Sequence, residues 1–149
     1  MVRIEFPESA CAFVVDGNGD VLLVEQWRRL HGIDTLELPG GSLDAHEDPA
    51  SAAVRELAEE TGYHVPDLRF VMTLDMDFSA SIHRTHVFFG RLPEKCAPTP
   101  REKEIKDVRL IPLADALEMV ESGEITHAPT VAAMFWYARG ARDTDSNDL

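Results

Sequence analysis

The chain has 149 residues, of which 44% are hydrophobic, and its formal net charge at pH 7 is −13. This length and composition predict one globular domain with a sizeable hydrophobic core. The acidic charge argues against a protein that binds nucleic acid, because no basic patch offsets the repulsion between its carboxylates and the phosphate backbone.

Cys11 and Cys96 lie far apart and lack metal-ligand spacing. We expect both thiols to be reduced, as in a cytoplasmic protein. The six histidines also form no metal-ligand pattern and are expected to be non-ligand residues. The N-terminal stretch MVRIEFPESA has no signal-peptide hydrophobic region, and no apolar run approaches membrane-spanning length. The sequence therefore predicts no membrane partner.

Short strands are predicted before the most informative segment. Residues 10–15 and 21–27 flank the sequence DGNGD at 16–20, which is typical of a β-hairpin turn. Residues 35–38 form a brief strand that leads into LPGGS at 38–42. We expect this to be a tight glycine loop, whose backbone can approach a ligand or metal closely.

A helix with one apolar face follows this loop. Asp48 is expected to cap its N-terminus, Pro49 to occupy the first turn, and Gly62 to end it. Its other face is acidic and is offered to a site, whereas the apolar face packs on a core.

Glu56, Glu59 and Glu60 stand at i, i+3 and i+4, so they share that second face of the helix. Three carboxylates so close together repel one another, and their arrangement favours a site for a divalent cation such as Mg²⁺ or Mn²⁺. Arg55 lies beside them, where its guanidinium can orient a carboxylate.

Further strands are predicted at 68–78, 83–92 and 105–111, with a proline-containing loop at 93–100. Pro112 and Pro129 each start a helix, and Gly123 ends the first of these. The resulting pattern is an α/β fold with a mixed sheet, in one domain over residues 1–140. The polar tail at 141–149 is expected to be disordered.

The segment from Gly41 to Tyr63 resembles the Nudix box, the signature of the Nudix hydrolases. Gly41 is followed after five residues by Glu47, and after seven more by Arg55-Glu56-Leu57-Ala58-Glu59-Glu60-Thr61-Gly62. The resemblance covers almost the whole chain and implies a Nudix-type α/β/α sandwich. It also implies a metal-dependent hydrolase that cleaves a phosphoanhydride bond by water attack.

The resemblance further implies roles for individual residues. The carbonyl of Gly40 would join Glu56, Glu59 and Glu60 as a metal ligand, with Glu47 and Arg55 in supporting roles. Nudix enzymes often recruit a late glutamate as a ligand or general base. Glu102 and Glu104, in REKE before the strand at 105–111, are placed for this role, and a solvated charged loop is the alternative.

Two stretches are similar to the ADP-ribose and nucleoside-diphosphate-sugar pyrophosphatases: EQWR at 25–28 and LELPGG at 36–41. In that branch Arg28 would bind a substrate phosphate, Glu37 would contact the substrate, and Trp27 would stack on a base or ribose. The alternatives are a core position for Trp27 and a surface position for Arg28.

Other substrates and assemblies stay open. Pro39-Gly40-Gly41 is equally typical of Nudix enzymes that cleave nucleoside triphosphates or dinucleoside polyphosphates, and some Nudix domains bind nucleotides without catalysis. The ADP-ribose branch often builds an intertwined dimer from a longer N-terminal sheet, and a homodimer stays open here.

Overall fold

The computed structural model describes residues 2–141 of the chain. Its strands are β1 (Ile4–Glu5), β2 (Ser9–Val15), β3 (Asp20–Arg28), β4 (Ile33–Glu37), β5 (Gly40–Ser42), β6 (Arg69–Asp75), β7 (Ser81–Ile82), β8 (Arg84–Arg91) and β9 (Asp107–Pro112). Its helices are α1 (Pro49–Thr61), α2 (Leu113–Glu121) and α3 (Ala128–Trp136), followed by the short π-helical turn η1 (Tyr137–Ala141). Disorder was predicted for residues 141–149; Ala141 is the last residue of η1, and residues 142–149 lie outside the described part.

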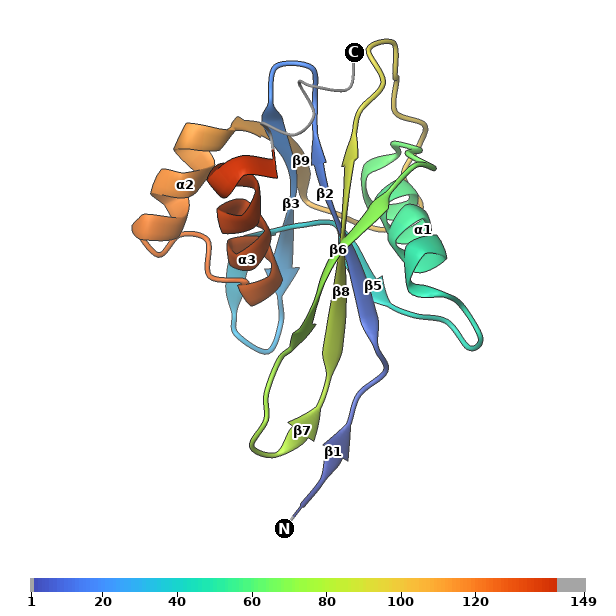
Figure 1. Cartoon of the computed structure of the whole chain (residues 1–149), viewed down its shortest axis with the longest axis vertical. Helices are drawn as coiled ribbons and strands as arrows, with labels where there is room; N and C mark the ends of the chain where they lie inside the picture. The colour runs from blue at the N-terminus through green and yellow to red at the C-terminus, as the bar shows by residue number, and fades with distance from the viewer. Residues whose placement is uncertain (1, 142–149) are drawn as a thin grey trace.

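Seven strands form one mixed sheet. The order β4-β3-β2-β8-β6 is extended by β9, which pairs with β3, and by β5, which pairs with β2. β2 and β8 run parallel, and the other pairs in this sheet are antiparallel. α1 lies on one side of the sheet, and α2 and α3 lie on the other (Figure 1). The predicted α/β/α sandwich is confirmed.

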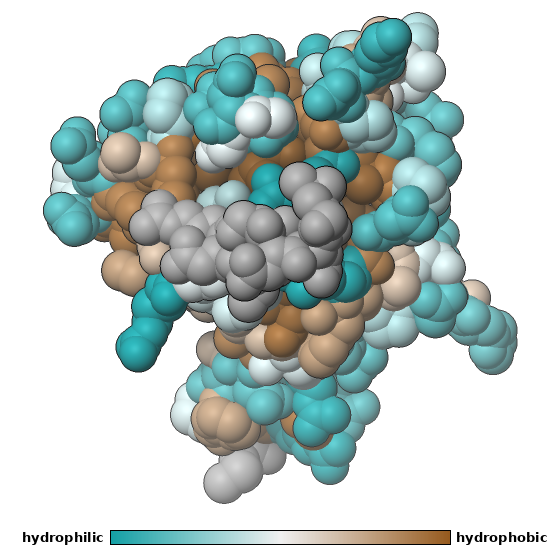
Figure 2. All heavy atoms as spheres, turned by 45° about the horizontal axis from the view of Figure 1, so that its top comes forward, coloured by the Kyte–Doolittle hydropathy of each residue, from teal (hydrophilic) through white to brown (hydrophobic). Residues whose placement is uncertain are grey.

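The alternation of side chains along β2 divides the core into two layers. Phe13 packs in a cluster with Met134 of α3, whereas Val14 packs in a second cluster with Leu57 of α1. Because successive strand residues point to opposite faces, one strand serves both helical layers. Figure 2 shows polar and charged side chains around much of the rim of one face, with apolar side chains visible inside that rim.

The predicted hairpin turn between β2 and β3 is present but joins strands that soon separate. Asp16 accepts hydrogen bonds from the backbone of Asn18 and Asp20, both at 2.9 Å. Beyond the turn the two strands share only the register pair Val15 and Val21. β3 then pairs with β4 and β9, while β2 pairs with β8. The sheet therefore opens into a fork.

β5 enters this fork, and the prediction of a glycine loop at 38–42 was wrong for its last three residues. They pair antiparallel with β2, Cys11 opposite Gly40 and Ala10 opposite Gly41. A Cβ atom on Gly40 would lie 2.6 Å from Cβ of Cys11, so glycine is required for the two strands to approach. The segment is thus part of the sheet.

Other element boundaries differ at the ends. The strand predicted at 68–78 stops at Asp75, because the Asp77 carboxylate accepts backbone hydrogen bonds from Ser79, Ala80 and Ser81 and turns the chain. The parallel pair of β1 and β7, which extends from the body of the sheet (Figure 1), was not predicted. No helix among residues 2–141 has the length and apolar character that crossing a membrane requires. Cys11 and Cys96 are both free thiols.

Candidate active site

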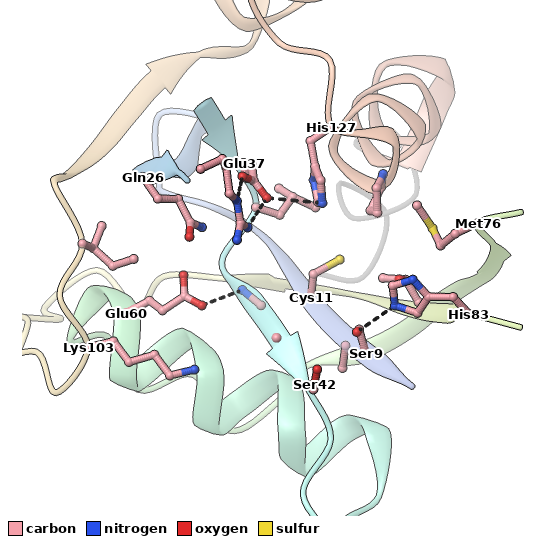
Figure 3. Close-up of a pocket in the computed structure, with 18 of the residues that line it drawn as sticks. Ser9, Cys11, Gln26, Glu37, Ser42, Glu60, Met76, His83, Lys103 and His127 are labelled. Carbon is pink, nitrogen blue, oxygen red and sulfur yellow. Dashed lines mark hydrogen bonds and ion pairs between the residues drawn. The ribbon is translucent and has the colours of Figure 1, made fainter. Parts of the chain in front are cut away.

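A cavity of about 470 Å³ lies in the fork between β2 and β3. β2 contributes Cys11, β3 contributes Gln26 and Arg28, and α1 contributes Glu60 (Figure 3). The cavity exists because the two strands have separated and backbone alone, from β5, fills part of the gap between them. Of the predicted residues it brings together Gly40 and Glu60 of the metal site and Arg28 and Glu37 of the substrate site.

α1 is built as the sequence predicts. The Asp48 carboxylate caps the helix by accepting a 3.1 Å hydrogen bond from the backbone of Ser51. Gly62 ends it in the left-handed conformation at φ 79°, with its N–H bonded to the carbonyl of Ala58. The carboxylate-bearing face of this helix looks inward, since Glu56 and Glu60 are only 2% and 3% exposed.

Arg55 clamps three of the predicted carboxylates. Its guanidinium donates two 2.8 Å hydrogen bonds to the two oxygens of Glu47. Nη1 donates at 3.0 Å to Glu56 and at 3.2 Å to Glu59. The hydrogen bonds from Arg55 hold the pKa of Glu47 at about 2, and those to Glu47 raise the pKa of Arg55. This clamp fixes the acidic face before any cation arrives.

Glu60 is the least satisfied group in the site. Its Oε1 accepts a 3.2 Å hydrogen bond from the backbone of Gly40, and its Oε2 is buried with no hydrogen-bond partner among the described residues. Burial, followed by the nearby charge of Glu56, raises the pKa of Glu60 to about 8. A buried carboxylate oxygen without a partner is what a bound cation would satisfy.

The donors around Glu60 fit a hard divalent cation. Carboxylate oxygens and backbone carbonyls are the ligands that Mg²⁺ and Mn²⁺ prefer. A Cβ atom on Gly41 would lie 2.6 Å from the carboxylate carbon of Glu56, so only glycine leaves this carboxylate its position. Within residues 2–141, however, no three His, Cys, Asp or Glu side chains are already arranged to hold a metal. The side chain of Lys103 instead contacts Glu56 and Glu59.

One wall of the cavity is organised around Glu37. Arg28 donates two hydrogen bonds to its carboxylate, and Nε2 of His127 lies 3.4 Å from it. Burial is the largest single effect and raises the pKa of Glu37, but the hydrogen bonds and charges around it, led by the hydrogen bond from Arg28, together outweigh burial and lower that pKa. Nδ1 of His127 is in turn 2.8 Å from the Thr130 hydroxyl, which accepts the backbone N–H of Leu38. This network joins the N-terminus of α3 to the strands beside the cavity (Figure 3).

Two residues predicted to belong to the site, Trp27 and Glu104, do not lie deep in the cavity. Trp27 is 60% exposed, which excludes the alternative of a core residue. It stands between Gln26 and Arg28 on β3, and since strand residues alternate, it points away from the cavity that those two line. Glu104 is exposed at the mouth of the cavity. Any contact of Trp27 with a substrate must therefore occur outside this cavity.

Sequence reasoning missed Lys103, His127 and His83 as cavity residues. His83 lies 3.2 Å from the Ser9 hydroxyl (Figure 3). Lys103 is 47 positions from Glu56 along the chain, and no sequence spacing connects a loop lysine with a helix that distant. His127 precedes Pro129 at a helix start, a position that suggests only a helix boundary.

Known proteins resemble the chain over most of its length. The NUDIX domain model matches residues 5–134. An ADP-ribose pyrophosphatase of Bacillus subtilis (strain 168) is 31% identical over 135 residues, covering 88% of this chain and 72% of that protein. An ADP-ribose pyrophosphatase of Mycobacterium tuberculosis is 34% identical over 125 residues, covering 80% of this chain and 59% of that protein. An ADP-sugar pyrophosphatase of Mus musculus is 31% identical over 135 residues, covering 85% of this chain and 61% of that protein.

A solved structure shares the fold. The crystal structure of an ADP compounds hydrolase matches with a TM-score of 0.76, at 22% sequence identity, over 89% of this chain and 71% of that one. The family model covers residues 5–134 and therefore includes β2 to β9 and α1 with its carboxylates. This chain belongs to the Nudix hydrolase family.

Proposed function

We propose that the protein is a Mg²⁺- or Mn²⁺-dependent pyrophosphohydrolase acting on a nucleoside diphosphate linked to another moiety, such as ADP-ribose. The observation that carries this proposal is Oε2 of Glu60, which is buried without a hydrogen-bond partner among residues 2–141 and lies beside clamped carboxylates, in the same cavity as Arg28. A cation site and an anion-binding guanidinium that face one space suit a diphosphate substrate.

Glu56, Glu59, Glu60 and the carbonyl of Gly40 are the residues that would hold the cation. A bound divalent cation neutralises phosphate charge and lowers the pKa of a bound water. The chain's own contribution is orientation. Arg55 holds Glu56 and Glu59 in place through Nη1 and is itself held by Glu47. Because these contacts exist in advance, little ordering remains when the substrate binds.

Arg28 is proposed to bind a substrate phosphate. Nε and Nη2 of its guanidinium already donate to Glu37. Nη1 is proposed to take an anion in the cavity, and the two bonds to Glu37 fix the plane of the guanidinium. Glu37 is proposed to contact the substrate from the same wall. Glu104, exposed at the cavity mouth, is proposed as the late glutamate that acts as general base or additional ligand.

The names of the relatives support the choice of substrate. The Bacillus subtilis and Mycobacterium tuberculosis proteins are ADP-ribose pyrophosphatases, and the Mus musculus protein is an ADP-sugar pyrophosphatase. The chain spans 59% to 72% of the length of these relatives, so their whole activities are not transferred with the family. A panel of ADP-ribose, sugar nucleotides, dinucleoside polyphosphates and nucleoside triphosphates decides among substrates. Preference for triphosphates would replace the diphosphate proposal.

The substitution Glu60→Gln tests the metal site. It preserves the shape of the side chain and removes the charge that a cation requires, so turnover should fall below detection while the circular dichroism spectrum is unchanged. Glu118→Gln, on the exposed side of α2, is the matched control and should keep full activity. Wild-type turnover by Glu60→Gln would overturn the ligand assignment.

Two further predictions concern the cellular location and the oligomeric state of the protein. We infer a cytoplasmic protein from its two free thiols, of which Cys11 is buried. A homodimer is a prediction that light scattering on the purified full chain would decide.

A further inference from the structure

Residues 99–103, at the end of the proline-containing loop and just after it, are hydrogen-bonded to the C-terminal end of α1. The backbone N–H groups of Glu102 and Lys103 both donate to the carbonyl of Glu59, at 3.0 and 2.9 Å. Thr99 donates from its backbone at 2.8 Å and from its hydroxyl at 3.0 Å to the carbonyl of Gly62. These bonds satisfy carbonyls that a helix end leaves free, and they hold residue 103 beside the acidic face.

The ammonium of Lys103 contacts Oε2 of Glu56 and lies 3.2 Å from Oε2 of Glu59. Arg55 contacts the other oxygen of Glu56 at 3.0 Å, so each oxygen of this buried carboxylate faces one cation. Figure 3 shows the Lys103 side chain extending into the cavity along α1. The two cations differ in freedom, because the Arg55 side chain is 25% exposed and that of Lys103 is 43% exposed.

Arg55 also donates hydrogen bonds to Glu47 and to the carbonyl of Ser42, and these bonds hold its guanidinium in place. Lys103 ends in a compact ammonium on a flexible four-carbon stem, and this side chain is partly exposed to solvent. Of the two cations at Glu56, it is therefore the one that can leave.

We propose that Lys103 is a tethered counter-ion, which neutralises Glu56 and Glu59 while the divalent site is empty and is displaced when a divalent cation binds. This inference rests on the proposed metal-dependent function. An ammonium and a divalent cation cannot share the same carboxylate oxygens without strong repulsion, since both are positive and would lie within a few ångströms. The backbone hydrogen bonds from Glu102 and Lys103 to the carbonyl of Glu59 would keep the displaced ammonium at the mouth of the cavity.

Competition of this kind has a measurable result. Displacing Lys103 from the carboxylates costs free energy and so weakens cation binding. Removing the ammonium should therefore tighten the binding of the cation. A lysine that instead supported the ligands from outside the site would have the opposite effect, because its loss would loosen the carboxylates. The sign of the change in metal affinity separates the two roles.

The test is Mn²⁺ binding to the full chain, measured by electron paramagnetic resonance and calorimetry without substrate. Lys103→Met keeps the apolar stem and removes the charge, and it should bind Mn²⁺ about tenfold tighter than the wild type. Lys103→Arg keeps the charge and should stay within about threefold of the wild type. Lys106→Met is the matched control, because Lys106 pairs with Asp34 and Glu25 and not with α1.

Thermal unfolding provides a second readout. When a chelator keeps divalent cations away, Lys103→Met should unfold at a lower temperature than the wild type, because the Glu56 carboxylate stays buried but has lost one of its two counter-ions. Saturating Mn²⁺ should remove that difference. Equal or weaker Mn²⁺ binding by Lys103→Met would overturn the counter-ion role and leave the proposed function intact. Absence of Mn²⁺ binding in both proteins would overturn the proposed function itself, and the counter-ion role with it.

Discussion

Arg28 and Glu37, on neighbouring strands β3 and β4, are joined by two parallel hydrogen bonds, Nε to Oε2 at 2.7 Å and Nη2 to Oε1 at 2.6 Å. Glu37 is 3% exposed and Arg28 borders the cavity, so the buried partner holds the accessible one in a fixed plane. Such two-point pairing is specific to arginine.

The substitution Arg28→Lys should therefore damage substrate binding. A lysine ammonium keeps the charge but cannot reproduce both bonds to Glu37 while it also presents a donor to the cavity. We expect KM to rise by about tenfold with a smaller change in kcat, as measured by steady-state kinetics with the best substrate of the panel. Arg29→Lys, at the exposed next position, is the control. An unchanged KM in Arg28→Lys would contradict a role in phosphate binding.

Arg55 and Glu47 should behave as one unit. Arg55→Lys loses the fork that joins Glu47 to Glu56 and Glu59, and we expect kcat/KM to fall by about 10- to 100-fold. Glu47→Gln should produce a smaller loss, because it weakens only the anchor of the fork. The double variant should be less impaired than the product of the two single losses, since both act through the same carboxylates. Independent, multiplicative losses would show that the two residues act separately.

Gly41→Ala tests whether space beside Glu56 is required. The added Cβ atom would lie 2.6 Å from the Glu56 carboxylate carbon and would displace a predicted metal ligand. A shift of about 1 Å there should lower turnover by about 100-fold and weaken Mn²⁺ binding. Gly17→Ala, in the turn between β2 and β3, has open space around it and is the control. Turnover equal to that of the control would mean that the carboxylate can move without consequence.

His127 should make the stability of the protein sensitive to acid. Burial lowers the pKa of His127, the charge of Glu37 opposes this shift, and the charge of Arg28 adds to it. The folded protein therefore holds the neutral ring, whereas the unfolded chain takes up a proton near pH 6.5. Since the unfolded state binds more protons, stability is present above that pH and is lost as the pH falls below it.

Urea unfolding of the wild type and His127→Gln at a series of pH values from 8 to 5.5 measures this linkage. The wild type should lose more free energy of unfolding than the variant on acidification, so the two curves converge or cross at low pH. Parallel curves would show that His127 does not carry the acid sensitivity.

The sequence predicted α1 to the residue, because its boundaries depend on local chemistry. Asp48 and Gly62 terminate the helix through contacts with residues only a few positions away. The grouping of Glu56, Glu59 and Glu60 follows from the helical repeat alone. The same holds for the turn at 16–20, whose Asp16 carboxylate bonds to its near neighbours.

The fork in the sheet could not be predicted in the same way. Residues 10–15 and 21–27 look like an ordinary hairpin, and their separation depends on β8, β9 and β5, which lie elsewhere in the chain. Lys103 and His127 reach the site by long-range packing for the same reason. Trp27 illustrates a third limit, because the strand was recognised but not which of its faces borders the cavity.

The pairing of β5 with β2 has a consequence for motion during turnover. Gly41 pairs with Ala10, which is completely buried, so we expect its amide to exchange with deuterium only when the sheet opens. The amide of Gly40 donates to Glu60, so this carboxylate of α1 is held by the same strand. We therefore expect the motion that admits substrate to involve residues 99–103, which a few backbone hydrogen bonds hold to the end of α1.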